Sequence, residues 1–308
     1  MIGLLFSGQG AQKTGLTQDL YETIPTYHKV IDDAATILQF DLPSLLFDEA
    51  KEADLASTKY CQPAILAMSY GLYQLIKTEL PRDKFGIGLS LGEYSALAAS
   101  GCVDFATALR LIKCRGELMQ AASESTPSKM AAIMKADLAD VQAVCKDAAG
   151  LGAIGVANVN TPQQIVVGGV SAAVDQVVSD LKAAGKRVVP LQVSGAFHTP
   201  VMAPIQSALN TKLQTVNWQH GTFPVYSTTT QAEFKPDTLT DNLTKQLVST
   251  TYFAKTLAAH QANLDAVIEV GPGRTLISFA RKLNRDLATY RLDSSSELNK
   301  TLAAMEVL

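Results

Sequence analysis

The sequence predicts an α/β protein in which a short parallel sheet is accompanied by a smaller, inserted domain. Mainly apolar runs at residues 2–6, 85–89 and 266–270 each lead into a glycine-containing turn, as buried parallel strands often do. Helical patterns separate these runs along the chain, which is typical of sheets built from strand and helix units. Between residues 127 and 194 the expected order changes to strand, helix, strand, strand, helix, strand.

The first of these strands is followed by the glycine-rich loop Ser7-Gly8-Gln9-Gly10-Ala11-Gln12. Such a loop suggests a dinucleotide site, but Lys13 stands where the third glycine is needed, and the sequence contains no Gly-Lys-Ser/Thr for phosphate binding. We therefore interpret the glycines as places where the backbone approaches a substrate closely.

Helical patterns follow at residues 16–40 and 53–80. The second contains Gln62-Pro63-Ala64. We expect Pro63 in the first turn of a helix, because proline lacks the N–H group that later turns require.

The strand at residues 85–89 runs into Gly88-Leu89-Ser90-Leu91-Gly92, and a helical pattern rich in Ala and Leu begins at once. A serine on so sharp a turn projects its hydroxyl away from the backbone, and glycines on either side avoid clashes. The N-terminus of the next helix offers free N–H groups and a positive dipole end, which favour an oxyanion. Ser90 is therefore a candidate nucleophile, although a turn that needs its glycines only for packing has the same pattern.

Asp104 is a suitable N-cap for a helix over residues 105–121. At 100° per residue, Arg115 falls on the edge of the apolar stripe of this helix, beside Ala108 and Met119. A half-buried arginine needs an anion, and either a substrate or a structural carboxylate could supply it.

The polar residues 122–129 mark a change in the chain. The six elements that follow are expected at residues 130–134, 137–149, 155–160, 164–168, 171–184 and 187–193. Their βαββαβ order is that of a ferredoxin-like unit. We therefore expect a small domain over residues 127–194, inserted into a large α/β-hydrolase-like domain formed by residues 1–126 and 195–308. A further strand of the large sheet is expected at residues 223–227.

Of the four histidines, His198 alone leaves a strand through glycine, in Ser194-Gly195-Ala196-Phe197-His198. A lone histidine is often an ordinary satisfied side chain, but together with an elbow serine it becomes a candidate general base. In α/β-hydrolases the triad acid falls between the serine and the histidine, and the histidine lies near the C-terminus. Here every acidic residue between Ser90 and His198 lies in a helical or polar stretch of its own, and residues 199–308 follow the histidine. We expect a Ser–His dyad whose orienting partner is neutral.

Composition narrows the classes of function. A hydrophobic content of 47%, a charged content of 18% and a net charge of −3 describe a soluble globular protein and argue against a nucleic-acid partner. The cysteines form no C-x-x-C pair, which disfavours a metal site or a disulfide framework; they are Cys61, Cys102, Cys114 and Cys145. Because the N-terminus lacks a basic region and no apolar run approaches about 18 residues, we expect a cytoplasmic protein without a membrane partner.

Six motifs together resemble those of the malonyl-CoA:acyl carrier protein transacylase family. They run in the family's order along nearly the whole chain: Gly8-Gln9-Gly10-Ala11-Gln12, Gln62-Pro63-Ala64, Gly88-Leu89-Ser90-Leu91-Gly92-Glu93-Tyr94-Ser95, Arg115-Gly116, Gly195-Ala196-Phe197-His198 and Glu269-Val270-Gly271-Pro272-Gly273. Two positions depart from the commonest form of the family, which has histidine at Leu89 and proline at Ser7. Neither supplies chemistry that a dyad requires, so the departures concern details of the pocket.

The resemblance implies a role for each of several residues. Ser90 would be the nucleophile, His198 the base, and Arg115 the anchor of the malonyl carboxylate. The remaining assignments are the backbone N–H groups of Gln9 and Leu91 as oxyanion hole, the main-chain carbonyl of Gln246 as the group that orients His198, and Gln62 and Phe197 as substrate-binding residues. The Gly-Ala-Phe-His pattern around Phe197 resembles the one associated with malonyl rather than methylmalonyl selection.

The resemblance also implies ping-pong transfer of malonyl from malonyl-CoA to the phosphopantetheine thiol of acyl carrier protein by a monomer, with no metal or bound cofactor. The acceptor could belong to fatty acid synthesis or to a polyketide assembly line. Two other hypotheses remain. One is a thioesterase or esterase with the same nucleophile. The other is a non-catalytic carrier-binding module, which would be signalled by a missing Ser, His or Arg, but all three are present.

Overall fold

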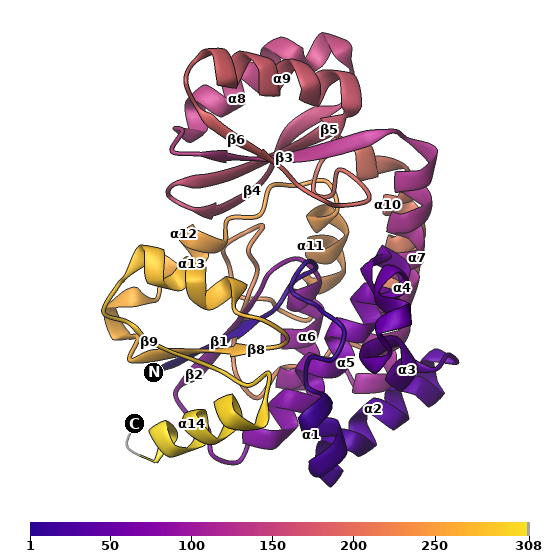
Figure 1. Ribbon diagram of the computed structural model, residues 1–308, viewed down its shortest axis with the longest axis vertical. Coiled ribbons are helices and arrows are strands. Elements are labelled where there is room, and N and C mark those ends of the chain that lie inside the picture. The colour runs from indigo at the N-terminus through magenta and orange to yellow at the C-terminus, as the bar shows by residue number, and fades with distance from the viewer. Residues whose placement is uncertain (307–308) are drawn as a thin grey trace.

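Two β-sheets organise the chain in the computed structural model, which describes residues 1–306 (Figure 1). The larger sheet is parallel throughout, and its strands are, in spatial order, β7 (Val225–Tyr226), β2 (Lys84–Gly88), β1 (Ile2–Phe6), β8 (Ala266–Val270) and β9 (Ala288–Arg291). The molecule is thus an α/β protein with a short parallel sheet, as the sequence predicts.

Side chains that alternate along β1 divide the core of this sheet into two layers. Leu4 and Phe6 belong to the larger cluster, which also holds side chains of α2 (Pro25–Leu38), α5 (Thr58–Ile76), α6 (Leu91–Ser100) and α7 (Phe105–Ser125). Leu5 belongs to a second cluster with side chains of α12 (Phe253–Ala258) and α13 (Thr275–Leu283). Both faces of the parallel sheet are therefore covered by helices.

The smaller sheet is antiparallel, and its strands are, in spatial order, β4 (Ile154–Thr161), β5 (Gln164–Val170), β3 (Ser128–Met134) and β6 (Arg187–Pro190). The helices α8 (Leu138–Asp147) and α9 (Ser171–Ala183) cover its outer face (Figure 1). Its inner face contributes Met130, Ala132 and Val166 to the larger cluster, so the sheet packs against the rest of the molecule. The element order matches the predicted βαββαβ order.

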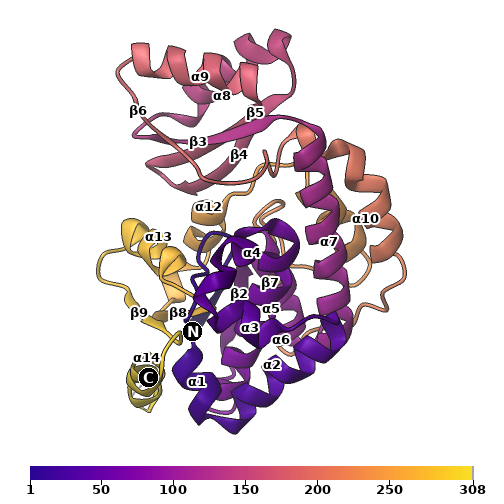
Figure 2. The same ribbon diagram turned by 45° about the vertical axis from the view of Figure 1, so that its right-hand side comes forward.

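The chain enters the small sheet from α7 and leaves it after β6, and a bridge adds a further contact with the rest of the molecule. Helix α7 runs beside the helices of the large sheet and leads into β3 (Figure 2). On the far edge, β4 forms a parallel bridge from Asn158 to Thr251, with Val159 N–H donating to the Thr251 carbonyl at 2.7 Å and Thr251 N–H donating to the Ala157 carbonyl at 3.0 Å.

The remaining helices lie around this frame. They are α1 (Gln18–Thr23), α3 (Leu42–Phe47), α4 (Glu52–Ala56), α10 (Gln206–Leu213), α11 (Leu239–Gln246) and α14 (Ser295–Met305), with the short 3₁₀ helices η1 (Glu49–Lys51), η2 (Ala148–Leu151), η3 (Pro200–Ile205) and η4 (Gln261–Asn263). Within residues 1–306, none of the helices has the length and apolar character that crossing a membrane requires.

Several predicted boundaries were wrong. The pattern at residues 16–40 is two helices, because Pro25 starts a new helix rather than continuing the first. The pattern at 53–80 is likewise divided between α4 and α5, and Pro63 lies inside α5, beyond its first turn. The helix predicted at 105–121 continues to Ser125, and the strand predicted at 187–193 ends at Pro190.

The strand predicted at residues 223–227 is reduced to Val225 and Tyr226. Pro224 precedes them and has no N–H group, so it cannot donate to a neighbouring strand, although its carbonyl accepts from Gly86 N–H at 2.9 Å.

Candidate active site

The candidate site lies where three strands of the large sheet end together. In the parallel register, Phe6 at the end of β1 is paired with Gly88 at the end of β2 and with Val270 at the end of β8. The loops that follow these strands are therefore neighbours. Open α/β sheets generally bind ligands at this carboxyl edge.

Ser90 occupies a strained turn between β2 and α6. Its φ is 58° and its ψ is −110°, an unusual conformation for a residue with a side chain. Both predicted glycines are required. A Cβ on Gly88 would lie 1.9 Å from the carbonyl carbon of Gly92, and a Cβ on Gly92 would lie 2.1 Å from the carbonyl oxygen of Phe6. The close approach of β1, β2 and α6 thus holds the serine in place.

His198 is hydrogen-bonded to Ser90 and to the backbone of Gln246. Its Nε2 lies 2.7 Å from Ser90 Oγ, and its Nδ1 lies 2.7 Å from the Gln246 carbonyl oxygen. A carbonyl can only accept, so Nδ1 carries the proton and Nε2 is free to accept the serine proton. The structure therefore brings together the three groups that the sequence predicts, including the neutral orienting carbonyl.

The environment keeps this histidine neutral. Burial, assisted by the nearby charge of Arg115, lowers the pKa of His198 to about 4, while the bond to the Gln246 carbonyl acts in the opposite direction. At neutral pH the imidazole is unprotonated and can act as a base.

Arg115 is wholly buried, more so than the half-buried position that the sequence predicts. Its Nη1 donates to Gln62 Oε1 at 2.7 Å, and its Nη2 donates to Gln246 Oε1 at 2.9 Å and to Ser90 Oγ at 3.1 Å. Within residues 1–306, no carboxylate lies within 4.0 Å of this guanidinium, and its Nε has no hydrogen-bond partner. A structural carboxylate therefore does not supply the expected anion.

The two predicted oxyanion-hole N–H groups are not used in the protein's own hydrogen bonds. In the part of the chain that the structure describes, neither the N–H of Gln9 nor that of Leu91 donates a hydrogen bond to another protein group. Leu91 is the first residue of α6, so its N–H has no acceptor within the helix. The side chain of Gln9 is held by Thr58, whose Oγ1 accepts from Gln9 Nε2 at 3.1 Å.

A cavity of about 350 Å³ opens onto Ser90 and His198 between the two sheets. Its apolar lining includes Leu89, Met119, Met130, Phe197 and Phe279, and its polar lining includes Asn158, Asn160 and Gln164. Both sheets thus contribute to one pocket. The predicted residues Gln62 and Arg115 lie behind Ser90, where the Arg115 bond to Ser90 Oγ places the guanidinium next to the pocket floor.

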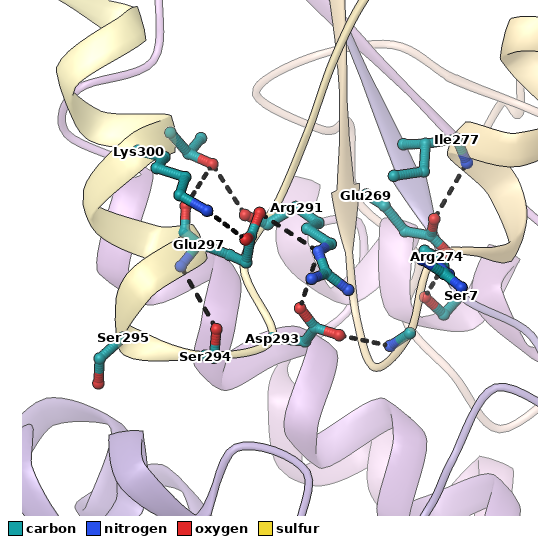
Figure 3. A network of polar contacts seen from close by, with 12 residues as sticks. Ser7, Glu269, Arg274, Ile277, Arg291, Asp293, Ser294, Ser295, Glu297 and Lys300 are labelled. Carbon is teal, nitrogen blue, oxygen red and sulfur yellow. Dashed lines mark hydrogen bonds and ion pairs between the residues drawn. The ribbon is translucent and has the colours of Figure 1, made fainter.

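Behind this edge, a buried carboxylate ties β1, β8 and α13 together (Figure 3). Glu269 Oε1 accepts from Ser7 Oγ at 3.2 Å and from Leu276 N–H at 3.1 Å, and Oε2 accepts from Ile277 N–H at 3.0 Å. Burial raises the pKa of Glu269 to about 7. Ser7, one of the two departures from the commonest family pattern, thus donates to the carboxylate that holds the start of α13.

The same network continues toward the C-terminus. Asp293 accepts from Gly273 N–H at 3.1 Å, and Arg291 Nε lies 3.6 Å from Asp293 and 3.3 Å from Glu297 (Figure 3). These bonds fix the turn after β8 against the segment after β9.

The sequence analysis missed Glu93, which is completely buried three residues after Ser90. Its carboxylate accepts from Thr228 and from Gln246 Nε2. The available signal was an acidic residue in the first turn of a helix that is otherwise Ala- and Leu-rich.

Comparison with known proteins agrees with this geometry. Residues 4–294 match the family model described as acyl transferase domain. A malonyl CoA-acyl carrier protein transacylase of Staphylococcus aureus (strain MRSA252) is 36% identical over 288 residues, which cover 92% of each chain. The chain belongs to the malonyl CoA-acyl carrier protein transacylase family. A Bacillus subtilis (strain 168) member is 32% identical over 99% of this chain and 97% of its own.

Solved structures of this transacylase family have the same fold. The crystal structure of MCAT from Streptococcus pneumoniae has a TM-score of 0.94 and 36% identity, with 99% of this chain and 100% of that one covered. A malonyl-transacylase bound to its type II PKS acyl-carrier protein, PlMCAT:AntF, also has a TM-score of 0.94, with 29% identity over 98% of this chain and 99% of that one.

Proposed function

We propose that the chain transfers the malonyl group from malonyl-CoA to the phosphopantetheine thiol of an acyl carrier protein through a malonyl-serine intermediate. One observation carries the proposal: a buried arginine, with no carboxylate partner among residues 1–306, donates to the hydroxyl of a serine that is paired with a neutral histidine. Membership of the transacylase family supports the same conclusion.

In the first half-reaction, Ser90 Oγ attacks the thioester carbonyl carbon and its proton passes to His198 Nε2. The carbonyl oxygen becomes an oxyanion, for which the N–H groups of Gln9 and Leu91 are the proposed donors. When the carbon–sulfur bond breaks, His198 returns the proton to the departing CoA sulfur. The Gln246 carbonyl favours the cationic imidazole while it exists.

In the second half-reaction, the carrier thiol gives its proton to His198, and its sulfur attacks the ester carbon of malonyl-Ser90. The collapse of this second oxyanion breaks the bond to Ser90 Oγ, which recovers the proton from His198. The enzyme returns to its starting state, and the reaction is ping-pong.

Arg115 and Phe197 are the proposed determinants of the acyl group. The Arg115 guanidinium would bind the malonyl carboxylate, and the bond from its Nη1 to Gln62 Oε1 would help to hold it in place. Phe197 lines the pocket and is only 7% exposed. Its ring would leave little room for an α-methyl group.

The two sheets suggest how the ester is shielded. We assign residues 1–126 and 195–308 to the catalytic domain and residues 127–194 to an inserted ferredoxin-like domain. Because the pocket is lined from both, the acyl-enzyme would lie between them, away from bulk water.

An assay of transfer against hydrolysis tests the proposal. The protein would be incubated with radiolabelled malonyl-CoA and with a holo acyl carrier protein from fatty acid synthesis or from a type II polyketide pathway, the latter because PlMCAT:AntF is a structural neighbour. We expect label on carrier protein and little free malonate. Release of free malonate at the rate of CoA release, with either carrier present, would instead identify a thioesterase.

A further inference from the structure

Glu93 is a fully buried carboxylate to which the proposed reaction gives no task. It lies in the first turn of α6, and its Oε1 accepts from the N–H of Thr228 at 2.6 Å and from Thr228 Oγ1 at 2.7 Å. Its Oε2 accepts from Gln246 Nε2, also at 2.6 Å. Within residues 1–306 it has no cation within 4.0 Å. A buried charge held only by neutral donors needs an explanation.

The side-chain amide of Gln246 connects this carboxylate to the substrate anchor. Its Nε2 donates to Glu93 Oε2 and, at 3.0 Å, to the carbonyl oxygen of Ser90. Its Oε1 accepts from Arg115 Nη2 at 2.9 Å. The chain of bonds therefore runs from Thr228 through Glu93 and Gln246 to Arg115.

The direction of these bonds is determined at both ends. A guanidinium can only donate, so the amide oxygen of Gln246 must face Arg115 and its nitrogen must face Glu93. At the other end, the backbone N–H of Thr228 can only donate to Glu93. The side chain at position 93 must therefore accept on both of its terminal atoms, and a carboxylate can do this while an amide cannot.

The arrangement also balances charge without occupying the anchor. Glu93 and Arg115 attract each other, yet the Gln246 amide stands between them, so the guanidinium makes no direct ion pair. A carboxylate in direct contact would compete with an anionic substrate for the same N–H groups.

We propose that Glu93 is the positioning residue for Arg115 and acts through the side-chain amide of Gln246. The inference rests on the proposed function, because it gives Arg115 the malonyl carboxylate as its ligand. Replacing Glu93 with Gln keeps the volume but sets an NH₂ group against the amide nitrogen of Gln246. If Gln246 rotates its amide to relieve that conflict, its NH₂ meets the guanidinium instead. In the first case Gln246 loses the acceptor that holds its amide in place, and in the second case the bond from Arg115 to Gln246 Oε1 is itself lost.

The test compares kcat/KM for malonyl-CoA and acetyl-CoA in wild type, E93Q, Gln246→Met and the double variant. Gln246→Met removes the amide but keeps the backbone carbonyl that orients His198. Loss of a hydrogen bond to a charged group corresponds to about a 10- to 100-fold fall, so we expect E93Q and Gln246→Met each to lose that much on malonyl-CoA. In E93Q, activity on acetyl-CoA, which has no carboxylate to anchor, should change less than about threefold.

The double variant shows whether Glu93 acts through Gln246. If it does, E93Q adds no further loss on malonyl-CoA once Gln246 is methionine. Thr228→Val is the matched control: it removes one hydroxyl donor to Glu93 but leaves the Gln246 link and the Thr228 N–H bond, and we expect malonyl activity within about threefold of wild type. Thermal melting of each variant confirms that it is folded, and Gln246→Met decides the question if E93Q does not fold.

Three results would overturn the inference. The first is a kcat/KM of E93Q for malonyl-CoA within threefold of wild type, which indicates a packing role. The second is an equal loss of kcat/KM on both thioesters in E93Q, and the third is a double variant whose loss on malonyl-CoA is the product of the two single losses. Arg115→Ala in the same assay separates this from failure of the proposed function. If wild type has no malonyl preference for Arg115→Ala to remove, the proposed function fails; if that preference exists and E93Q keeps it, only the role of Glu93 fails.

Discussion

Ser90 and His198 are joined by a 2.7 Å hydrogen bond, and both have a positive φ, 58° and 60°, although neither is glycine. Such conformations cost about 1–3 kcal/mol each and persist only where the surrounding structure enforces them. At Ser90 the enforcement comes from the contacts of Gly88 and Gly92. Near His198, Gly195 packs so closely on Ser123 that a Cβ would lie 2.0 Å from its Oγ. The backbone therefore positions both partners before a substrate arrives.

Replacing His198 with Ala should lower the rate of Ser90 acylation by about 10²–10⁴-fold, because the serine loses its general base. Single-turnover quench-flow with malonyl-CoA measures this step directly. A variant within tenfold of wild type would show that His198 has a structural role only.

The depressed pKa of His198 predicts an unusual pH dependence. The base must be neutral, and with a pKa of about 4 it stays neutral as the pH falls from 8 through the range where an ordinary histidine protonates. We expect acylation by acetyl-CoA, which has no carboxylate for Arg115 to bind, to stay level from pH 8 to about pH 5.5 and to fall only as the pH approaches 4. A midpoint near pH 6.5 in kcat/KM would contradict the buried, neutral histidine.

Arg115→Ala should lower kcat/KM for malonyl-CoA by roughly 30- to 5,000-fold, since loss of one partner of a desolvated charge pair costs about 2–5 kcal/mol. Acetyl-CoA should be unaffected or improved, so the preference between the two thioesters collapses or inverts. Arg115→Lys should recover only part of the loss, because a point charge cannot reproduce a two-pronged contact. Equal losses on both substrates would make Arg115 a structural residue.

Glu269→Ala should lower the free energy of unfolding by about 2–5 kcal/mol, because it leaves the buried N–H groups of Leu276 and Ile277 without their acceptor. Ser7→Ala is the control: it removes only one donor to the same carboxylate and should cost about 1 kcal/mol or less. Urea denaturation measures both. If the two variants are equally stable, Glu269 does not hold the start of α13.

Much of the site follows from local sequence. The glycines around Ser90 predict the sharp turn, and the glycine before His198 predicts the exit from a strand. The position of Arg115 beside the apolar stripe predicts the helix face on which it lies. Each signal depends only on residues that are close in the sequence. The parallel strands at 2–6 and 266–270 have the predicted bounds because every residue in them is buried, and all but Glu269 are apolar or glycine.

What could not be predicted depends on contacts between distant segments. Glu93, Gln246 and Arg115 are far apart in the sequence and meet only in the folded molecule, so no local pattern shows that they are in contact. Strand β9 was missed because it is short and half-exposed, so its sequence lacks the apolar run of the central strands. The division at Pro25 was readable, since proline favours the first turn of a new helix.

The most direct test of the account is the mass of the protein after brief exposure to malonyl-CoA without carrier protein. We predict that wild type gains one malonyl group, that peptide mapping places it on Ser90, that Ser90→Ala gains none, and that added holo acyl carrier protein removes the group from wild type. A malonyl adduct that persists in Ser90→Ala, or one mapped to another residue, would contradict the assignment of Ser90 as the nucleophile.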